Sequence, residues 1–431
     1  LGPAGLFAAW ELAHSGARPL IVERGQDVDR RKISVDTFWA GGAFNPRSNV
    51  QFGEGGAGAF SDGKLTTGTK SPLIRTVLQT FVDHGAPEDI LYIAKPHVGT
   101  DLLKGVVRSM RQEIIQLGGQ VRFDTRLTGL MMRGESMEGI TVLCGGETQE
   151  IRTDTVILAI GHSARDTMQT LFRQGVRMEQ KPFAMGVRIE HPQALISQSQ
   201  YGKCWTHPAL KAADYKLAVH TPDGRGTYTF CMCPGGYVVN ASSEEGRLAV
   251  NGMSYSGRDG KNANSAIIVA VTPDDFAGKD PLAGVRFQEM LEERTFAIGK
   301  GRIPQQLFGD YCSNRASVSY GAFESATKGA CVLGNLRGLL PQALEESFIE
   351  GMHAFSRRIP AFDQEDAILS GVESRTSSPV RLVRDPKLLV AAGGIYPCGE
   401  GAGYAGGIMS AAMDGLKVAE AIMRDMEEQR G

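Results

Sequence analysis

The sequence is poor in cysteine, in net charge and in long apolar runs, and each shortage excludes a class of protein. Only seven of its 431 residues are cysteine, with no CxxC pair and no HExxH, so neither a disulfide framework nor a structural zinc site is expected. The 46 basic and 48 acidic residues leave a net charge of −2, which disfavours a nucleic-acid partner held by bulk positive charge. The mean hydropathy is −0.16, and no apolar run reaches the ~18 residues of a membrane span.

These shortages, together with the absence of a secretory signal, predict a reduced, cytoplasmic protein with no metal site and no membrane contact. Glycine, by contrast, is in excess. It accounts for 54 of 431 residues, about 12.5%, against a usual ~7%. The densest cluster is FGEGGAGAFSDGKL, at 52–65. Such clusters predict loops in which the backbone approaches a ligand closely.

The first third of the chain alternates helical and strand patterns. A helix is predicted from Gly2 to Gly16, then a short buried strand at 19–22, while 25–95 has an irregular, glycine-rich pattern. A second helix is predicted from about 100 to 117, with Leu102, Val106, Met110 and Ile114 as its apolar stripe. Three strand patterns follow: QVRFD at 120–124, a small antiparallel meander at 126–152, and the apolar run at 155–161 that is typical of a parallel sheet.

The pattern changes after about residue 178. Two helices are predicted there, at 280–297 and 342–357, and the second carries the stripe Leu344, Phe348, Met352 and Phe355. A strand and glycine turn at 388–403 and a helix at 405–427 resume the first pattern. The predicted architecture is an α/β domain with a doubly wound parallel sheet and a small meander (1–178 and 369–431), interrupted by an inserted α+β domain (179–368). Strands of the insertion are predicted at 183–190, 226–233, 236–241, 248–255 and 266–271.

Gly2-Pro3-Ala4-Gly5 opens the first helix, and Glu23 ends the next strand 18 residues after Gly5. This is the second half of a GxGxxG dinucleotide turn, in which glycines admit a pyrophosphate to the helix N-terminus and the acid binds a ribose. We expect the first glycine and its strand to lie upstream of Leu1, so that the chain is an N-terminally truncated fragment. Two further GxGxxG matches, at 53–58 and 401–406, lack the strand context and are interpreted as loops that touch the same ligand.

Taken in order, these blocks resemble one family. GPAG…VERG, FGEGGAGAFSDGKL, VILAIGHSARDT, KPFAMGVRIEHPQ, FCMCPGGYVVNAS and YPCGEGAGYAGGIMSAAMDGL are similar to the bacterial FAD-dependent dehydrogenase-like proteins, the NAD(FAD)-utilising dehydrogenases, which largely lack an assigned substrate. The resemblance covers essentially the whole chain. It implies an FAD/NAD(P)-binding fold and FAD as the coenzyme.

The resemblance also assigns roles to residues. It implies pyrophosphate contacts at Gly2, Pro3, Ala4 and Gly5, a ribose contact at Glu23, and an adenine contact at the backbone of Leu127. It implies that Ala159, Ile160 and Gly161 lie beneath FAD and that Gly399, Glu400, Gly401 and Ala402 precede a helix whose N-terminus faces the flavin pyrimidine. The remaining expected FAD contacts are Arg24, Gly56, Ala57, Ser61 and Lys64.

Candidate catalytic residues carry alternatives. Lys64 is expected to contact flavin N5 or a substrate anion, or else to be a solvated loop lysine. Glu400 acts beside the coenzyme or caps a helix, and Arg375 clamps an anionic substrate or forms an interdomain ion pair. His162 follows the apolar strand and is catalytic or structural.

Cys231 and Cys233 suggest a thiol pair, with Cys233 as the candidate catalytic thiol. Residues two apart in a strand point to one face, but their Cα atoms are ~6.6 Å apart in a regular strand. That spacing is too wide for an unstrained disulfide unless the strand is bent. The alternative is two buried strand thiols.

The leading hypothesis is an FAD-dependent oxidoreductase. It transfers hydride or electrons between a reductant, with NAD(P)H as a candidate transient co-substrate, and an unidentified small-molecule acceptor. Two alternatives stay open: an FAD-binding tRNA-modifying enzyme and a non-enzymatic flavin-binding sensor or scaffold. The substrate and the oligomeric state do not follow from the sequence.

Overall fold

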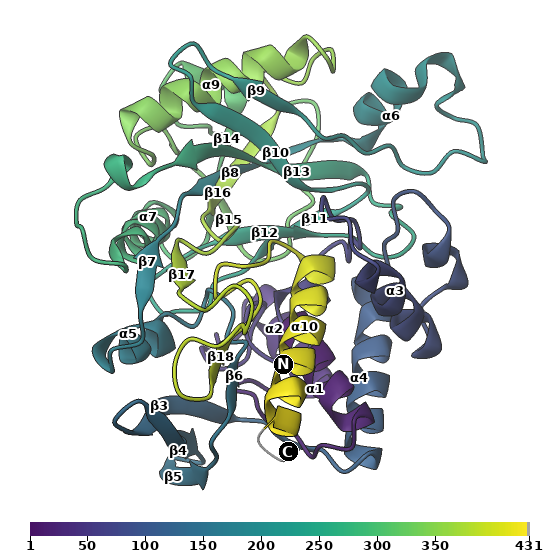
Figure 1. Ribbon diagram of the computed structural model, residues 1–431. Coiled ribbons are helices and arrows are strands. Elements are labelled where there is room, and N and C mark those ends of the chain that lie inside the picture. The colour runs from purple at the N-terminus through teal and green to yellow at the C-terminus, as the bar shows by residue number, and fades with distance from the viewer. Residues whose placement is uncertain (429–431) are drawn as a thin grey trace.

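The computed structural model describes residues 1–428, in which a broad sheet and a group of long helices occupy opposite ends of the molecule (Figure 1). The broad sheet belongs to the predicted insertion, residues 179–368, and its last strand extends it to residue 373. That group of helices and several short strands come from residues 1–178 and 374–428, called here the flanking part. No helix among residues 1–428 is long and apolar enough to cross a membrane.

Helix α1 (Pro3–His14) begins directly after Gly2, with a proline in its first turn, where the missing N–H removes no helical hydrogen bond. It lies along the terminal helix α10 (Ile408–Glu428) (Figure 1). Gly415 allows this approach, because a Cβ there would collide with the carbonyl oxygen of Ala4. Helix α4 (Thr100–Gln116) packs on the other side of α1, so three helices cover one face of the short strands.

Four short strands form two parallel pairs. Strand β1 (Leu20–Val22) pairs with β2 (Gln120–Arg122), and β6 (Val156–Leu158) pairs with β18 (Ile395–Pro397). Helices cover one face. The antiparallel meander of β3 (Thr125–Arg133), β4 (Ser136–Cys144) and β5 (Glu147–Arg152), together with α5 (Arg165–Arg173), packs against the β6–β18 pair from the other. These layers confirm the predicted α/β class with its small meander. Within residues 1–428, β1 and β6 each pair along one edge only.

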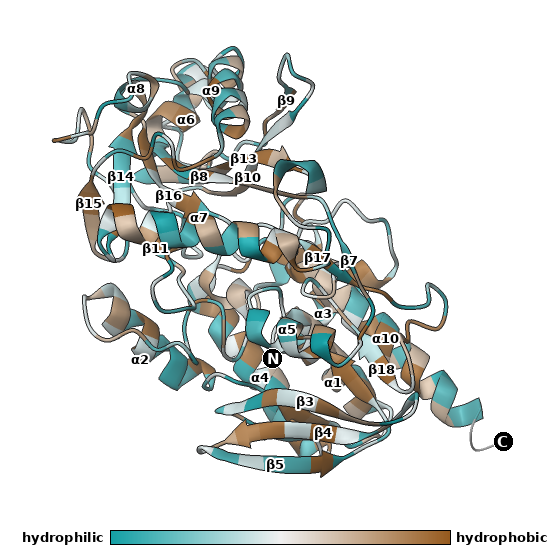
Figure 2. Ribbon diagram, turned by 90° about the vertical axis from the view of Figure 1, so that its left-hand side faces the viewer, coloured by the Kyte–Doolittle hydropathy of each residue, from teal (hydrophilic) through white to brown (hydrophobic). Residues whose placement is uncertain are grey.

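The insertion is built on a seven-stranded sheet of order β15-β14-β16-β8-β13-β10-β9, antiparallel except for the β14–β15 pair. Its two longest strands, β8 (Phe183–Pro192) and β13 (Asn262–Val271), pair over ten residues. Figure 2 shows α9 (Gln342–Ser356) above this sheet and α7 (Ala283–Gly299) below it. The remaining strands of the sheet are β9 (Ala218–His220), β10 (Gly226–Cys233), β14 (Ile303–Leu307), β15 (Cys331–Leu333) and β16 (Ile368–Glu373).

Smaller elements connect these layers. The strand pairs β7–β17 and β11–β12 lie outside the large sheet. Their bounds, with those of the short helices, are β7 (Met178–Gln180), β17 (Val380–Leu382), β11 (Tyr237–Asn240), β12 (Val250–Met253), α6 (Gln193–Tyr201), α8 (Phe308–Cys312) and the 3₁₀ turns Ala57–Phe60, Glu88–Leu91, Gly202–Cys204 and Pro273–Asp275.

The predicted irregular segment 25–95 was wrong in part, because it contains α2 (Val28–Trp39) and α3 (Leu73–Asp83). Helix α2 buries only Val28, Arg31 and Val35, so it has little apolar periodicity to detect. The stripe predicted for α4 was also wrong at Leu102, which is 39% exposed, whereas Leu103 is buried. A step of four residues advances about 40° beyond a full turn, so three such steps carry Leu102 away from the face of Ile114.

Candidate functional site

One cavity of about 1110 Å³ runs between the flanking part and the insertion. The flanking part contributes the N-terminus of α1, strands β1 and β6, and the glycine-rich loop 51–64. The insertion contributes residues of β10, β12 and the loop after β12. Both β1 and β6 line the cavity.

Most of the predicted site residues line this cavity, although they come from seven separate segments of the chain. Four predicted residues do not line it: Gly399, Gly401, Ala402 and Cys233. Those that do are Gly2, Pro3, Ala4, Gly5, Glu23, Arg24, Gly56, Ala57, Ser61, Lys64, Leu127, Ala159, Ile160, Gly161, Arg375 and Glu400.

The turn before α1 and the glycine-rich loop are in direct backbone contact. Gly56 has φ +59°, and a Cβ on it would lie 2.9 Å from the Cα of Gly2. The fully buried guanidinium of Arg31 organises this loop by donating to the carbonyls of Asn49 (2.8 Å) and Val50 (2.9 Å), among others. Sequence analysis missed Arg31, because a buried arginine within a polar helix has no periodic signal.

The residues at the end of β1 are held by the protein itself. Glu23 accepts hydrogen bonds from the backbone amides of Gly25 (2.8 Å) and Gly53 (3.0 Å). Arg24 donates to Asp166 at 2.7 Å. The predicted contact between Glu23 and a ribose stays a prediction. The carboxylate of Glu23 is already held at the cavity wall by the two backbone amides.

The loop after β18 serves packing more than had been expected. The amide of Gly399 donates to Asp414 at 2.7 Å, and a Cβ on Gly401 would collide with the backbone of Gly161. Ala402 is fully buried. These three residues therefore hold the loop in place, and Glu400 is the side chain that the loop presents to the cavity.

Lys64 connects the glycine-rich loop to the insertion. Its Nζ donates to the carbonyl of Met232 in β10 and lies 3.9 Å from Asp62. Asp62 is itself bound by Arg258, whose Nε donates at 2.9 Å. Since Arg258 already neutralises Asp62, Lys64 contributes uncompensated positive charge at this end of the cavity. Its side chain is 31% exposed, so Lys64 is partly solvated while it bridges the loop and the insertion, and its role stays a prediction.

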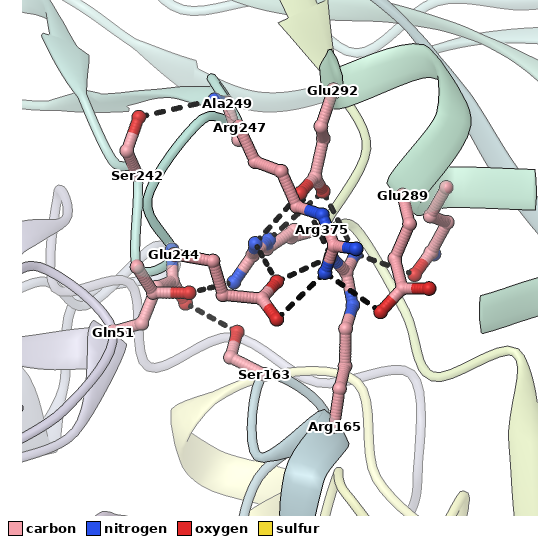
Figure 3. A network of polar contacts seen from close by, with 12 residues as sticks. Gln51, Ser163, Arg165, Ser242, Glu244, Arg247, Ala249, Glu289, Glu292 and Arg375 are labelled. Carbon is pink, nitrogen blue, oxygen red and sulfur yellow. Dashed lines mark hydrogen bonds and ion pairs between the residues drawn. The ribbon is translucent and has the colours of Figure 1, made fainter. Parts of the chain in front are cut away.

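Arg375 belongs to a network of ion pairs between the flanking part and the insertion (Figure 3). It donates to Glu292 at 2.8 and 3.1 Å, and Arg165 from α5 binds the same carboxylate through two 2.8 Å bonds. Burial alone would raise the pKa of Glu292, but the two guanidiniums hold it well below its usual range. The geometry thus favours the interdomain ion pair over the substrate clamp.

The two thiols of β10 have different environments. Cys233 is buried beside Arg188 and does not line the cavity, whereas Cys231 does. Strand β10 is bent at Cys231, with φ +43° and a register shift between Phe230 and Cys233. The bend that a thiol pair requires is present, but it directs the two side chains to different surroundings. Cys233 is therefore not the thiol exposed to a ligand.

A buried ion pair joins a lining residue of the cavity, Glu373, to Arg188, which lies behind it. Arg188 donates to Glu373 at 3.0 Å, to Asn264 at 2.7 Å and to the carbonyl of Cys231 at 2.6 Å. Burial raises the pKa of Glu373, although Arg188 opposes the shift. Arg188 fixes the bent backbone at Cys231 and so shapes the insertion's side of the cavity. Among residues 1–428, no group of His, Cys, Asp and Glu side chains is arranged to hold a metal ion.

Two sequence comparisons show which proteins this chain is similar to. A family model described as "FAD-dependent protein, C-terminal domain-like" matches residues 182–376. An uncharacterized protein of Clostridium beijerinckii is 50% identical over 430 residues, which cover 99% of this chain and 80% of that protein.

Solved structures resemble the chain more distantly. The flavin-dependent brominase Bmp2 has 12% identity and a TM-score of 0.45, covering 99% of this chain and 77% of that one. A geranylgeranyl bacteriochlorophyll reductase-like protein of Thermoplasma acidophilum has 12% identity and a TM-score of 0.44, with the same coverage of 99% and 77%.

Proposed function

Since this chain belongs to the same family as the Clostridium beijerinckii protein and carries the FAD-dependent C-terminal-like segment, its coenzyme is FAD, and we propose that it is an FAD-dependent oxidoreductase. It transfers hydride or electrons between a reductant and a small-molecule acceptor. NAD(P)H is the candidate reductant. The observation that carries the proposal is the cavity that the N-terminus of α1 and the glycine-rich loop 51–64 share with the insertion.

The residues present fit FAD. The N-terminus of α1 offers unpaired amides to a diphosphate, and the glycine contact between Gly2 and Gly56 leaves no side chain in front of it. His162 and Glu400 each present a buried polar atom without a partner in residues 1–428. Bound FAD supplies the hydride chemistry. The chain's own residues bind it, orient it and exclude water.

The insertion provides the other wall, where the substrate of the proposed reaction would bind. Lys64 and Arg258 bring positive charge to this wall, and Cys231, Met232 and Glu373 complete it. Because the carboxylate of Asp62 is bound by Arg258, the charge of Lys64 is free to attract an anionic group. The proposed role of Lys64 is to bind an anionic substrate or to stabilise the negative charge of reduced flavin.

The test is an anaerobic titration of the FAD-loaded protein with NADH and with NADPH, following the visible absorbance of oxidised flavin. Bleaching by either nucleotide, reversed by an added acceptor, is the expected result. Tight FAD binding without bleaching by any reductant would contradict the oxidoreductase proposal and would favour a flavin-binding sensor.

A matched pair of variants tests the role of Lys64. Lys64→Met removes the charge but keeps the length, and we expect it to slow one half-reaction by about tenfold, equivalent to about 1.4 kcal/mol. Lys70→Met is the control, because Lys70 is exposed and does not line the cavity. Equal rates in the two variants would remove Lys64 from the site.

A further inference from the structure

A histidine–glutamate pair lies at the edge where two neighbouring parallel strands end. Strands β6 and β18 pair with Leu158 opposite Pro397. His162 follows four residues after Leu158, and Glu400 follows three residues after Pro397. The carboxyl ends of paired parallel strands share one edge of the sheet, so side chains 238 residues apart in the sequence meet there. His162 Nδ1 lies 2.6 Å from Glu400 Oε2.

The pair is buried yet incompletely bonded. The His162 side chain is 8% exposed. Within residues 1–428, neither its Nε2 nor Oε1 of Glu400 has a hydrogen-bond partner. Buried polar atoms rarely lack a partner, because each one left unpaired is destabilising. Both residues line the cavity, so a ligand in the cavity is in position to supply the two missing partners.

The position of the pair indicates which part of a ligand it contacts. A Cβ on Gly5 would lie 3.4 Å from the Cβ of Ala159, and one on Gly399 would lie 2.6 Å from the Cβ of Ala4. The loops that carry His162 and Glu400 therefore pack directly on the first turn of α1. That turn presents unpaired amides and the positive end of the helix dipole, the usual environment of a phosphate.

We propose that His162, oriented by Glu400, is a ligand of the FAD diphosphate. Phosphate oxygens only accept hydrogen bonds, so Nε2 must donate to the diphosphate while Nδ1 donates to Glu400. An imidazole that donates from both nitrogens is an imidazolium. The imidazolium separates the carboxylate from the diphosphate and neutralises the repulsion between them. Oε1 of Glu400 then remains to accept from a hydroxyl of the adjoining ribityl chain.

The inference rests on FAD as the coenzyme of the proposed function, but it does not require turnover. The measurement is therefore ligand binding to the FAD-free protein by calorimetry, with three ligands. FAD contains adenosine, the diphosphate, the ribityl chain and the ring, ADP contains adenosine and the diphosphate without the ribityl chain or ring, and riboflavin contains the ribityl chain and ring without the diphosphate. His162→Ala is expected to weaken FAD and ADP binding by about ten- to hundredfold, the value of one charge-assisted hydrogen bond, and to leave riboflavin binding unchanged.

Two other histidines provide matched controls. His353 forms the same kind of pair, 2.7 Å from Asp363, on the surface of the insertion. His191 is fully buried with one unpartnered nitrogen, like His162, but does not line the cavity. His353→Ala and His191→Gln should leave the affinity for FAD and ADP unchanged. His162→Gln, which retains a donor near the position of Nε2, should recover part of the loss.

The outcomes separate the alternatives. Unchanged FAD and ADP affinity in His162→Ala, with an unchanged thermal midpoint of the FAD-free protein, would overturn the proposal. So would a loss confined to riboflavin, because His162 would then face the ribityl chain or the ring. A lower midpoint of the FAD-free protein without any change in ADP affinity would assign His162 a structural role. Wild-type protein that binds neither FAD nor ADP would contradict the coenzyme itself.

Discussion

Strand pairing is extensive in the insertion and sparse in the flanking part. In the insertion, β8 and β13 pair over ten residues and are buried almost throughout. In the flanking part, β1 and β6 are three residues long, and none of the three residues of β1 is fully buried. The insertion therefore carries a continuous core, whereas the flanking part places glycine loops around a cavity. The largest buried core and most of the residues that line the cavity therefore lie in different regions of the molecule.

The largest expected effect is at the junction of the two regions. Glu292→Gln removes the carboxylate that both Arg165 and Arg375 bind, leaving the two buried guanidiniums to share the partly exposed carboxylate of Glu244. We expect a loss of about 3–5 kcal/mol in the free energy of unfolding, measured by chemical denaturation. Glu293→Gln, on the same helix but exposed, is the control. Similar losses in both variants would show that the network does not join the regions.

The same carboxylate predicts a pH dependence. The pKa of Glu292 is lowered on folding, so the unfolded chain binds the extra proton first as the pH falls. The stabilisation is therefore complete above the ordinary pKa of glutamate, about 4.3, and is lost as the pH falls below it. The difference in stability between wild type and Glu292→Gln should shrink in that acidic range.

A core substitution in the insertion is expected to have nearly the same effect. Phe348→Ala removes a fully buried ring from the insertion's core and should destabilise the protein by about 3–5 kcal/mol. Ile157→Ala in β6, which is only partly buried beside the cavity, should lose clearly less. Denaturation of both variants tests the contrast, and an equal loss would mean that the short strands are as important to stability as the large sheet.

A substitution at the end of β1 should affect the affinity for FAD more than the stability of the fold. Glu23→Ala is expected to weaken FAD binding by about 1–3 kcal/mol, the value of hydrogen bonds to a charged group, measured by fluorescence titration. FMN, which has no adenosine ribose, should lose nothing. A parallel loss of FMN affinity would place Glu23 away from the ribose.

The smallest effect is expected at the thiols. Cys233 is buried beside Arg188 and only Cys231 lines the cavity, so a Cys231→Ser/Cys233→Ser variant should retain flavin reduction and most reoxidation. Stopped-flow measurement of the two half-reactions is the test. Loss of reoxidation with FAD still bound would make the thiols part of the reaction and would give the insertion a chemical role of its own.

The sequence was sufficient wherever the signal was local. The stripe Leu344, Phe348, Met352 and Phe355 is buried as predicted, because 3.6-residue periodicity acts within one helix. The turn at Gly2–Gly5 opens α1 as expected. The prediction failed for α2, where the apolar periodicity is weak. It also failed at Leu102, because the predicted stripe advanced by four residues at each step instead of 3.6.

The sequence by itself determined the coenzyme class, the α/β pattern and most of the segments that line the cavity, because these follow from short motifs and from residues near one another in the chain. Only the tertiary structure decided the partners. In the structure Arg375 pairs with Glu292, and β10 is bent at Cys231 so that Cys233 does not line the cavity. His162 lies beside Glu400, which is 238 residues away in the sequence. Hydrogen bonds and ion pairs depend on distances of a few ångströms, and no local pattern specifies which distant side chain will lie at that distance.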